Sequence, residues 1–199
     1  MQLLGVSHLL LVIVLINILC NAAYADVNIV PRSEWQAKQP RHEPINLTTI
    51  PPNWVVISHT ELTRGGGYCE TKKECYPLLR NLQIFHRDQQ GLNDIVYNFL
   101  VGGDGTVYEG RGWDIEGQHT KGYDSKSLGI AFIGDFESKS PREEQVNGVK
   151  NFLEYAVSQN KLTKDYKLIG QNQVPDEHTN SPGSKVSKII KTWEHWTEV

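Results

Sequence analysis

The chain has 199 residues, of which 39% are hydrophobic and 22% are charged, and its formal net charge at pH 7 is −3. This length is sufficient for one domain with a substantial hydrophobic core. Lys and Arg are scattered along the chain and are slightly outnumbered by Asp and Glu. The sequence therefore lacks the basic surface on which nucleic-acid binding depends, and we expect no nucleic-acid partner.

Residues 1–25 predict a secretory signal peptide. The run Leu9–Cys20 is too short to span a bilayer but suits a signal-peptide core. Ala23 and Ala25 then form a cleavage site of small residues. No Lys or Arg precedes the run, unlike most signal peptides, and an uncleaved anchor is the alternative. Because no later run could cross a membrane, we expect no membrane partner and a secreted, extracellular domain, residues 26–199.

The next segment, residues 26–53, is polar and rich in proline, and we expect an arm packed on the domain. It contains the sequon Asn46-Leu47-Thr48, which makes Asn46 a candidate glycosylation site of a secreted surface loop. The apolar run Val55–Ser58 predicts a buried central strand. Because this strand continues into His59 and Thr60, it predicts a binding site at its end.

Two cysteines remain after the signal peptide. Cys69 and Cys75 are an even pair in a secreted chain, which predicts a disulfide. Their spacing is not a common zinc spacing. Closing so short a loop stabilises a fold by roughly 2 to 3 kcal/mol on the chain-entropy model.

The middle of the chain predicts a helix, a hairpin and a strand. Apolar residues at helical spacing predict a helix over about Cys75–Gln89, with Pro77 in its first turn. Two runs of β-forming residues around Asp104-Gly105 predict a hairpin. The run Leu128–Phe136 predicts another buried strand.

The last third predicts two more helices and a short strand. Ser140 as N-cap, Pro141 and Glu143 form a capping box, and a buried stripe follows. Its members are Val146, Val149, Leu153, Ala156 and Val157. A strand over Tyr166–Gly170 and a helix over about Ser184–Thr192, capped near Ser181-Pro182, complete the chain. This order of elements indicates the α/β class, a single domain with a central mixed β-sheet flanked by helices.

Five segments resemble the peptidoglycan recognition proteins of animals: WVVISHT, LRNLQIFH, LNDIVYNFLVGGDGTVYEGRGW, LGIAFIGDF and the final SPG. The resemblance runs from PRSEW to TWEHW. It implies an N-acetylmuramoyl-L-alanine amidase-like fold with a cleft for a muramyl peptide. The Cys69–Cys75 pair matches a disulfide of that family, and the short single-domain form resembles its secreted insect members.

The same resemblance bears on catalysis. Catalytic members bind zinc through two His and one Cys and cut the bond between N-acetylmuramic acid and L-alanine, which requires an open fourth coordination position. The matching positions here are Ser58, Gln171 and Ser181, whose hydroxyl and amide groups are poor zinc ligands. Neighbours on a strand point to opposite faces, so His59 cannot substitute for the ligand at position 58. We therefore expect no metal site, no cofactor and no enzymatic activity.

The resemblance also names candidate peptidoglycan-binding residues. Tyr97 and Thr179 match groups that act beside the scissile bond in active relatives. The predicted cleft lining is His59, Thr60, His86, Tyr97 and His119. Each has an ordinary structural alternative, such as a surface histidine for His86 or a half-buried sheet residue for Tyr97. An acyl-transfer pair of Ser58 and His59 is disfavoured because adjacent strand side chains diverge.

One charged position predicts the kind of peptidoglycan. An arginine at the position of Arg111 resembles members that prefer meso-diaminopimelic acid (DAP) stems, whose extra carboxylate a guanidinium can grip with two hydrogen bonds. In the second determinant, Gly91-Leu92, the glycine agrees with the DAP class and the leucine fits neither class well.

Three functions stay open at this stage. The leading hypothesis is a secreted, non-catalytic pattern-recognition receptor of innate immunity that binds bacterial peptidoglycan and triggers a cascade through a downstream immune signalling protein. The alternative is an enzyme, either a zinc amidase with unusual ligands or a metal-free hydrolase. The third is a secreted domain that has lost the glycan and keeps only a protein partner.

Overall fold

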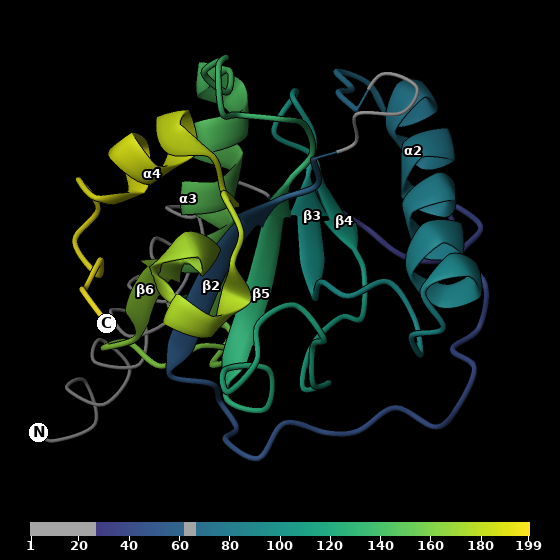
Figure 1. Cartoon of the computed structure of the whole chain (residues 1–199), viewed down its shortest axis with the longest axis horizontal. Helices are drawn as coiled ribbons and strands as arrows, with labels where there is room; N and C mark the ends of the chain where they lie inside the picture. Colours follow the sequence, from purple (N-terminus) through teal and green to yellow (C-terminus); the bar gives the residue numbers. More distant parts are fainter. Residues whose placement is uncertain (1–26, 62–66) are drawn as a thin grey trace, which may run out of the picture.

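The computed structural model describes residues 27–61 and 67–199 (Figure 1). The predicted signal peptide lies outside the described residues. No helix within them is long and apolar enough to cross a membrane.

Within the described residues, one mixed sheet of six strands forms the centre of the molecule, in the order β1-β4-β3-β5-β2-β6. The strands are β1 (Ile29–Val30), β2 (Trp54–His59), β3 (Phe99–Val101), β4 (Val107–Glu109), β5 (Ser127–Phe132) and β6 (Lys167–Gly170). The strand β2 pairs in parallel with both β5 and β6, so it is internal, as its apolar sequence predicted. Only β3 and β4 are antiparallel, and they form the predicted hairpin around Asp104-Gly105. The predicted mixed α/β fold is confirmed.

The helices lie on both sides of this sheet (Figure 1). They are α2 (Lys72–Ile84), which continues as a π-helix over Phe85–Gln89, α3 (Glu143–Ser158) and α4 (Ser184–Ile190). Alternate strand residues face opposite layers. On β3, Phe99 and Val101 pack in the cluster that contains α3 and α4, whereas Leu100 packs in the cluster that contains α2.

Three of the predicted element boundaries are wrong. The helix α2 begins at Lys72 rather than Cys75, because Thr71 is its N-cap and accepts from Glu74 N at 3.3 Å, which leaves Pro77 beyond the first turn. The capping box at Ser140 does not form, since α3 begins at Glu143 and Arg142 is the N-cap residue without a side-chain hydrogen bond. The strand β5 ends at Phe132 rather than Phe136.

The end of β5 has a local cause. Gly134 has a φ of +142°, a conformation that favours glycine, and the chain leaves the strand direction there. The Thr60 hydroxyl accepts a hydrogen bond from Gly134 N at 3.0 Å and fixes this turn to the end of β2.

The N-terminal arm packs on the domain as expected, and it also adds a strand. Ile29 and Val30 pair in parallel with β4 at the edge of the sheet. Trp35 is fully buried, and its indole N–H donates to Glu109 O at 2.9 Å. The sequence pattern does not predict this strand, because two residues are too few for any periodicity to show.

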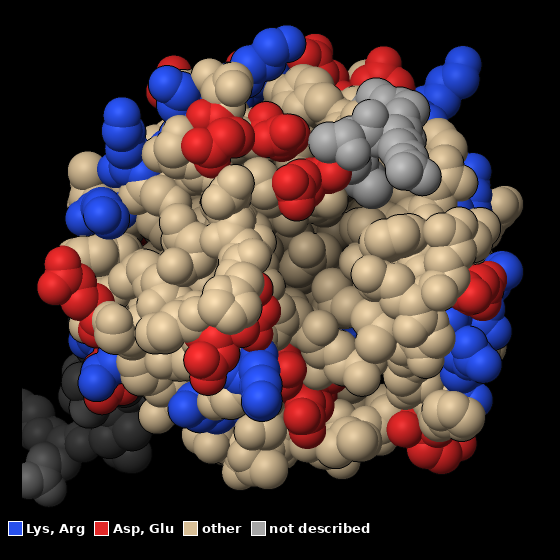
Figure 2. Space-filling model, viewed as in Figure 1, with Lys and Arg blue, Asp and Glu red and all other residues tan. Residues whose placement is uncertain are grey.

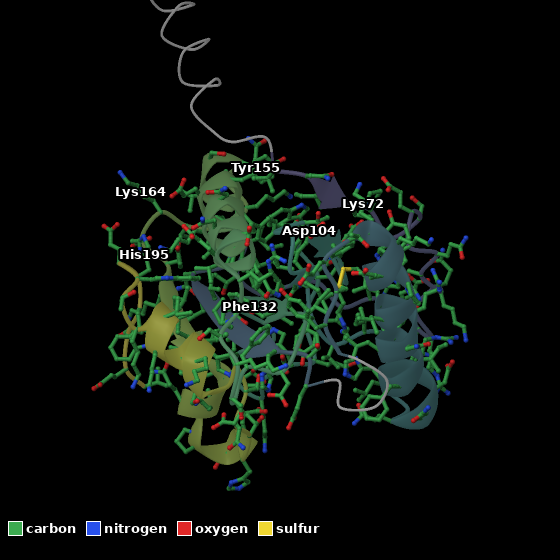
Figure 3. The ribbon with its side chains drawn as sticks, turned by 90° about the horizontal axis from the view of Figure 1, so that it is seen from above. Lys72, Asp104, Phe132, Tyr155, Lys164 and His195 are labelled. Atoms are coloured by element: carbon green, nitrogen blue, oxygen red, sulfur yellow. A yellow bond between two sulfur atoms is a disulfide. The ribbon has the colours of Figure 1, made fainter. Side chains whose placement is uncertain are left out.

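The predicted disulfide between Cys69 and Cys75 is confirmed, and it precedes and enters α2. Figure 3 shows it as the bond between two sulfur atoms near Asp104 and Lys72. Both cysteines are buried, at 1% and 0% exposure, in the cluster beneath α2. The cross-link therefore holds the start of α2 against the hairpin.

Replacing Cys69 and Cys75 together by serine should lower the free energy of unfolding by about 2 to 3 kcal/mol, because the unfolded chain regains the entropy of the open loop. Urea denaturation of the purified protein measures this, with Lys73→Gln on the exposed face of α2 as control. Equal midpoints for the double variant and wild type, or two free thiols in native wild type, would contradict it.

Candidate functional site

The three positions matched to zinc ligands meet at one edge of the sheet. The Ser58 hydroxyl, at the end of β2, donates to Gln171 Oε1 at 3.1 Å, and Gln171 directly follows β6. The Ser181 hydroxyl accepts from His59 N at 3.0 Å. Parallel neighbouring strands bring their carboxyl ends to the same edge, which is why residues more than a hundred positions apart converge here.

These side chains do not fit zinc. Structural and catalytic zinc sites use thiolate, imidazole or carboxylate donors, whereas this group offers two hydroxyls and one amide. The amide is also engaged, because Gln171 Nε2 donates to His119 O at 2.5 Å and to Glu177 Oε2 at 3.3 Å. Among the described residues, no three His, Cys, Asp or Glu side chains are arranged to hold a metal ion.

Ser181 has a role that its sequence context did not indicate. The sequence predicts an N-cap of the last helix near Ser181, but α4 begins at Ser184 with Gly183 at the N-cap position. Its hydroxyl instead holds the backbone of β2, and its own N–H donates to Thr179 Oγ1 at 3.1 Å. Thr179 is thereby attached to the same sheet edge.

Ser58 and His59 do not form a nucleophile pair. The ring of His59 lies beside Phe136, and its Nδ1 accepts from Phe136 N at 3.2 Å. The Ser58 hydroxyl instead contacts Gln171. His59 is only 2% exposed, and burial lowers its pKa. The structure thus does not bring the His59 ring to the group formed by Ser58 and Gln171.

Tyr97 reaches the end of β2 from the segment before β3. Its hydroxyl donates to His59 O at 3.2 Å, and the residue is 8% exposed. Burial raises the pKa of Tyr97 well above its ordinary value, so the group is a neutral hydroxyl at physiological pH. The ring of His86, from the π-helix, packs edge-on against it with 6.0 Å between ring centroids. The structure therefore brings His86 and Tyr97 together.

His119 lies against backbone that only glycine permits. A Cβ atom at Gly117 would be 2.3 Å from the imidazole Cδ2 atom, and one at Gly129 would be 2.2 Å from it. The His119 Nδ1 atom is 3.0 Å from Thr120 Oγ1, and Asp124 accepts from His119 N at 2.8 Å. The ring is therefore held in one position beside β5.

His86 and His119 are both neutral at physiological pH. Burial lowers the pKa of His119 to about 3 and that of His86 to about 4, and the positive charge of Arg111 is the second cause in each case. Neutral imidazoles can hydrogen-bond uncharged hydroxyl and amide groups. Arg111 is thus the charge that the two rings share as a neighbour.

The guanidinium of Arg111 is fixed by three acceptors. Nε donates to Ile95 O at 2.7 Å, Nη1 donates to Glu116 O at 2.8 Å, and Nη2 donates to the side chain of Gln118. A guanidinium carries five N–H groups, so each terminal nitrogen keeps one N–H beyond these bonds. Sequence reasoning missed these acceptors, since two are backbone carbonyls that leave no mark on side-chain patterns.

The remaining predicted residues lie near this group or on the surface. Gly91 is exposed with a φ of +72°, so its backbone conformation alone favours glycine. Leu92 is half-buried against the cluster beneath α2. Asn46 is exposed, as a glycosylation site requires.

Figure 2 shows that the surface is hollowed in front of the sheet, between α2 and the segment that follows β6.

Comparisons with known proteins identify relatives of this chain. A family model described as N-acetylmuramoyl-L-alanine amidase matches residues 48–184. Mouse peptidoglycan recognition protein 3 is 43% identical over 169 residues, which cover 85% of this chain but 46% of the mouse protein. Peptidoglycan-recognition protein SC2 of Drosophila melanogaster is 38% identical over 184 residues, which cover 92% of this chain and 96% of that protein.

A solved structure shows the same architecture. The crystal structure of peptidoglycan recognition protein-LE in complex with tracheal cytotoxin, a monomeric diaminopimelic acid-type peptidoglycan, matches with a TM-score of 0.80. The two chains are 41% identical, and the match covers 86% of this chain and 96% of the other.

Because the pKa values of His86 and His119 are lowered in the folded protein, we expect the protein to lose stability in acid. In the unfolded chain a histidine takes up a proton near pH 6.5, whereas the folded pKa values of His86 and His119 are about 4 and about 3. The contribution of these histidines to the free energy of unfolding is therefore fully present above about pH 6.5. It falls as the pH is lowered towards 4, by up to roughly 1.4 kcal/mol per pH unit for each histidine. Urea denaturation between pH 7 and pH 4 measures the slope.

The variant His86→Gln should make that slope shallower, because one proton fewer is taken up on unfolding. The exposed residue His42 supplies the matched control His42→Gln. An unchanged slope in His86→Gln would show that the acid sensitivity has another origin.

Proposed function

This chain belongs to the peptidoglycan recognition protein family, and from that premise we propose that it binds bacterial peptidoglycan without cleaving it. The observation that carries the proposal is the hydrogen bond between Ser58 and Gln171, at 3.1 Å. Two positions where catalytic relatives place metal ligands are here bonded to one another. The third, Ser181, holds the backbone of β2.

The chemistry of the three side chains is the reason for recognition without hydrolysis. An amidase needs a metal-bound water whose pKa is lowered towards neutrality, and hydroxyl and amide donors do not hold the ion that supplies it. Tyr97 and Thr179, which match groups beside the scissile bond, remain as neutral hydrogen-bonding groups. The alternative, an amidase with unusual ligands or a metal-free hydrolase, has no comparable observation in its favour.

The chemistry of the site suits a mostly uncharged ligand with one carboxylate. His86 and His119 are neutral, and Tyr97 keeps its proton. Such groups can bond the hydroxyls of a sugar and the amides of a stem peptide. We assign the cleft contacts to His59, Thr60, His86, Gly91, Leu92, Tyr97, Arg111, His119 and Thr179.

Arg111 supports a preference for DAP-type stems. Its guanidinium is fixed by three acceptors and keeps one N–H on each terminal nitrogen, the arrangement that a carboxylate accepts with two hydrogen bonds. A lysine-type stem lacks this carboxylate and places an ammonium there instead. The relative of known structure named above is bound to a DAP-type fragment.

The setting of this function is also proposed. Residues 1–25 have the pattern of a cleaved signal peptide, Asn46 is an exposed sequon residue, and the confirmed disulfide suits an oxidising compartment. We therefore place the protein outside the cell, as a pattern-recognition receptor of innate immunity that signals through a further protein. A domain that has kept only such a partner and lost the glycan is the alternative.

The purified protein should contain no stoichiometric zinc and should release no stem peptide from peptidoglycan. Elemental analysis and chromatography of digests on the same sample check both expectations. About one zinc per chain together with released peptide would establish the enzyme instead.

Introducing zinc donors at these three positions is a second test of the proposal. The combined change Ser58→His, Gln171→His and Ser181→Cys should create zinc affinity, because three soft or borderline donors then meet at one sheet edge. The single change Ser181→Cys should not, since one donor cannot hold the ion. Equal zinc contents for the triple and single variants would contradict this assignment of the three positions.

The variant Arg111→Thr should bind DAP-type fragments about 10- to 150-fold more weakly, which corresponds to roughly 1.5 to 3 kcal/mol for a charge-assisted pair. Lysine-type fragments should bind equally well or better, because the repulsion of an ammonium is removed. Titration calorimetry with both muropeptides measures the contrast, and thermal unfolding checks that the variant is folded. A loss of both ligands to the same extent would make Arg111 a structural residue.

A further inference from the structure

A cavity of about 430 Å³ is lined in part by the N-terminal arm, and Arg111 belongs to its lining whereas His86 and His119 do not. Arm residues 39–44 form one wall, and Asn93, Asp94 and Arg111 also belong to the lining. This volume lies in the range of pockets that hold small ligands, roughly 300 to 1,000 Å³. None of the contacts proposed above uses the cavity except those of Arg111.

The arm wall is fixed to the domain by the residue that follows Leu92. Arg41 N donates to Asn93 O at 2.9 Å, and His42 N donates to Asn93 Oδ1 at 2.7 Å. The Asn93 amide returns a hydrogen bond to His42 O at 3.2 Å. Three hydrogen bonds to one residue hold this part of the arm, so the cavity is built into the fold.

The charges around the cavity favour an anion. The carboxylate of Asp94 is buried, pairs with Arg32 at 2.8 Å and accepts from Gln83 Nε2 at 2.6 Å, so its charge is already compensated. No carboxylate of the described residues forms an ion pair with Arg41 or Arg111. Glu43 is the other acidic residue of the lining, and it is exposed. Two guanidiniums therefore face one exposed carboxylate.

Arg41 has free donors for such an anion. It lies exposed at the rim, and its Nη1 donates one hydrogen bond, to Arg87 O at 2.9 Å. Four of its five N–H groups remain for a ligand. Arg111 links this cavity to the cleft, because the same guanidinium lies close enough to His86 and His119 to lower the pKa of both.

We propose that this cavity binds the free α-carboxylate at the distal end of the stem peptide, with Arg41 as its partner. The inference rests on the proposed function, in which Arg111 grips the side-chain carboxylate of the third stem residue. A peptide chain advances by at most about 3.6 Å per residue, so the residue after the one at Arg111 is within reach of the adjoining cavity. In a tetrapeptide stem that residue carries the terminal carboxylate, which is the next negative charge along the ligand.

The experiment compares two tetrapeptide muropeptides that differ only at the C-terminus, one with a free carboxylate and one with a primary amide. Wild type should bind the free acid about two- to fivefold more tightly, the size expected for one solvent-exposed ion pair. The variant Arg41→Gln should bind both forms with the affinity that wild type has for the amide. The matched control Lys73→Gln removes the same charge from the exposed face of α2 and should keep the wild-type preference.

Three results would overturn the inference: equal binding of the two fragments by wild type, a preference that persists in Arg41→Gln, or a preference lost equally in Lys73→Gln. The last would mean that net charge alone is responsible. Absence of binding to either fragment by wild type would instead overturn the proposed function, and this inference with it.

Discussion

The parallel pairing of β2 with both β5 and β6 is the constraint on which the site depends. It places β2 inside the sheet, so that its residues from Val55 to His59 are all buried. Because neighbouring strand residues face opposite layers, Val55 and Ile57 pack in the cluster with α3 and α4, while Val56 packs with Ile169 on the other face. The last residues of β2 and the first after β6 then meet at a common edge.

Polar groups buried at that edge need hydrogen-bond partners, because an unpaired buried polar group destabilises the folded protein. Ser58 is fully buried, and its hydrogen bond to Gln171 satisfies the hydroxyl without a metal ion. Gln171 in turn donates to the backbone of His119. The group is thus a connected network that links β2, the segment after β6 and the loop before β5. Its hydroxyl and amide groups are poor zinc donors.

The electrostatics of the cleft follow from burial. Imidazole rings that are removed from water lose their charge, and the nearby guanidinium of Arg111 reinforces this effect at His86 and His119. The guanidinium itself stays charged because arginine does not lose its proton in proteins. The described residues around Arg111 therefore combine neutral hydrogen-bonding groups with one fixed cation.

The sequence by itself determined the class of fold, the internal strand, the hairpin and the disulfide, because each leaves a local mark: an apolar run, a turn dipeptide or an even pair of cysteines. Through family resemblance it also identified Ser58, Gln171 and Ser181 as positions without zinc donors. Only the tertiary structure decided what those side chains bond to, how Arg111 is held and where the arm closes a cavity over Asn93. These contacts join residues up to 122 positions apart or use backbone carbonyls, and neither kind of contact produces a periodic or compositional signal.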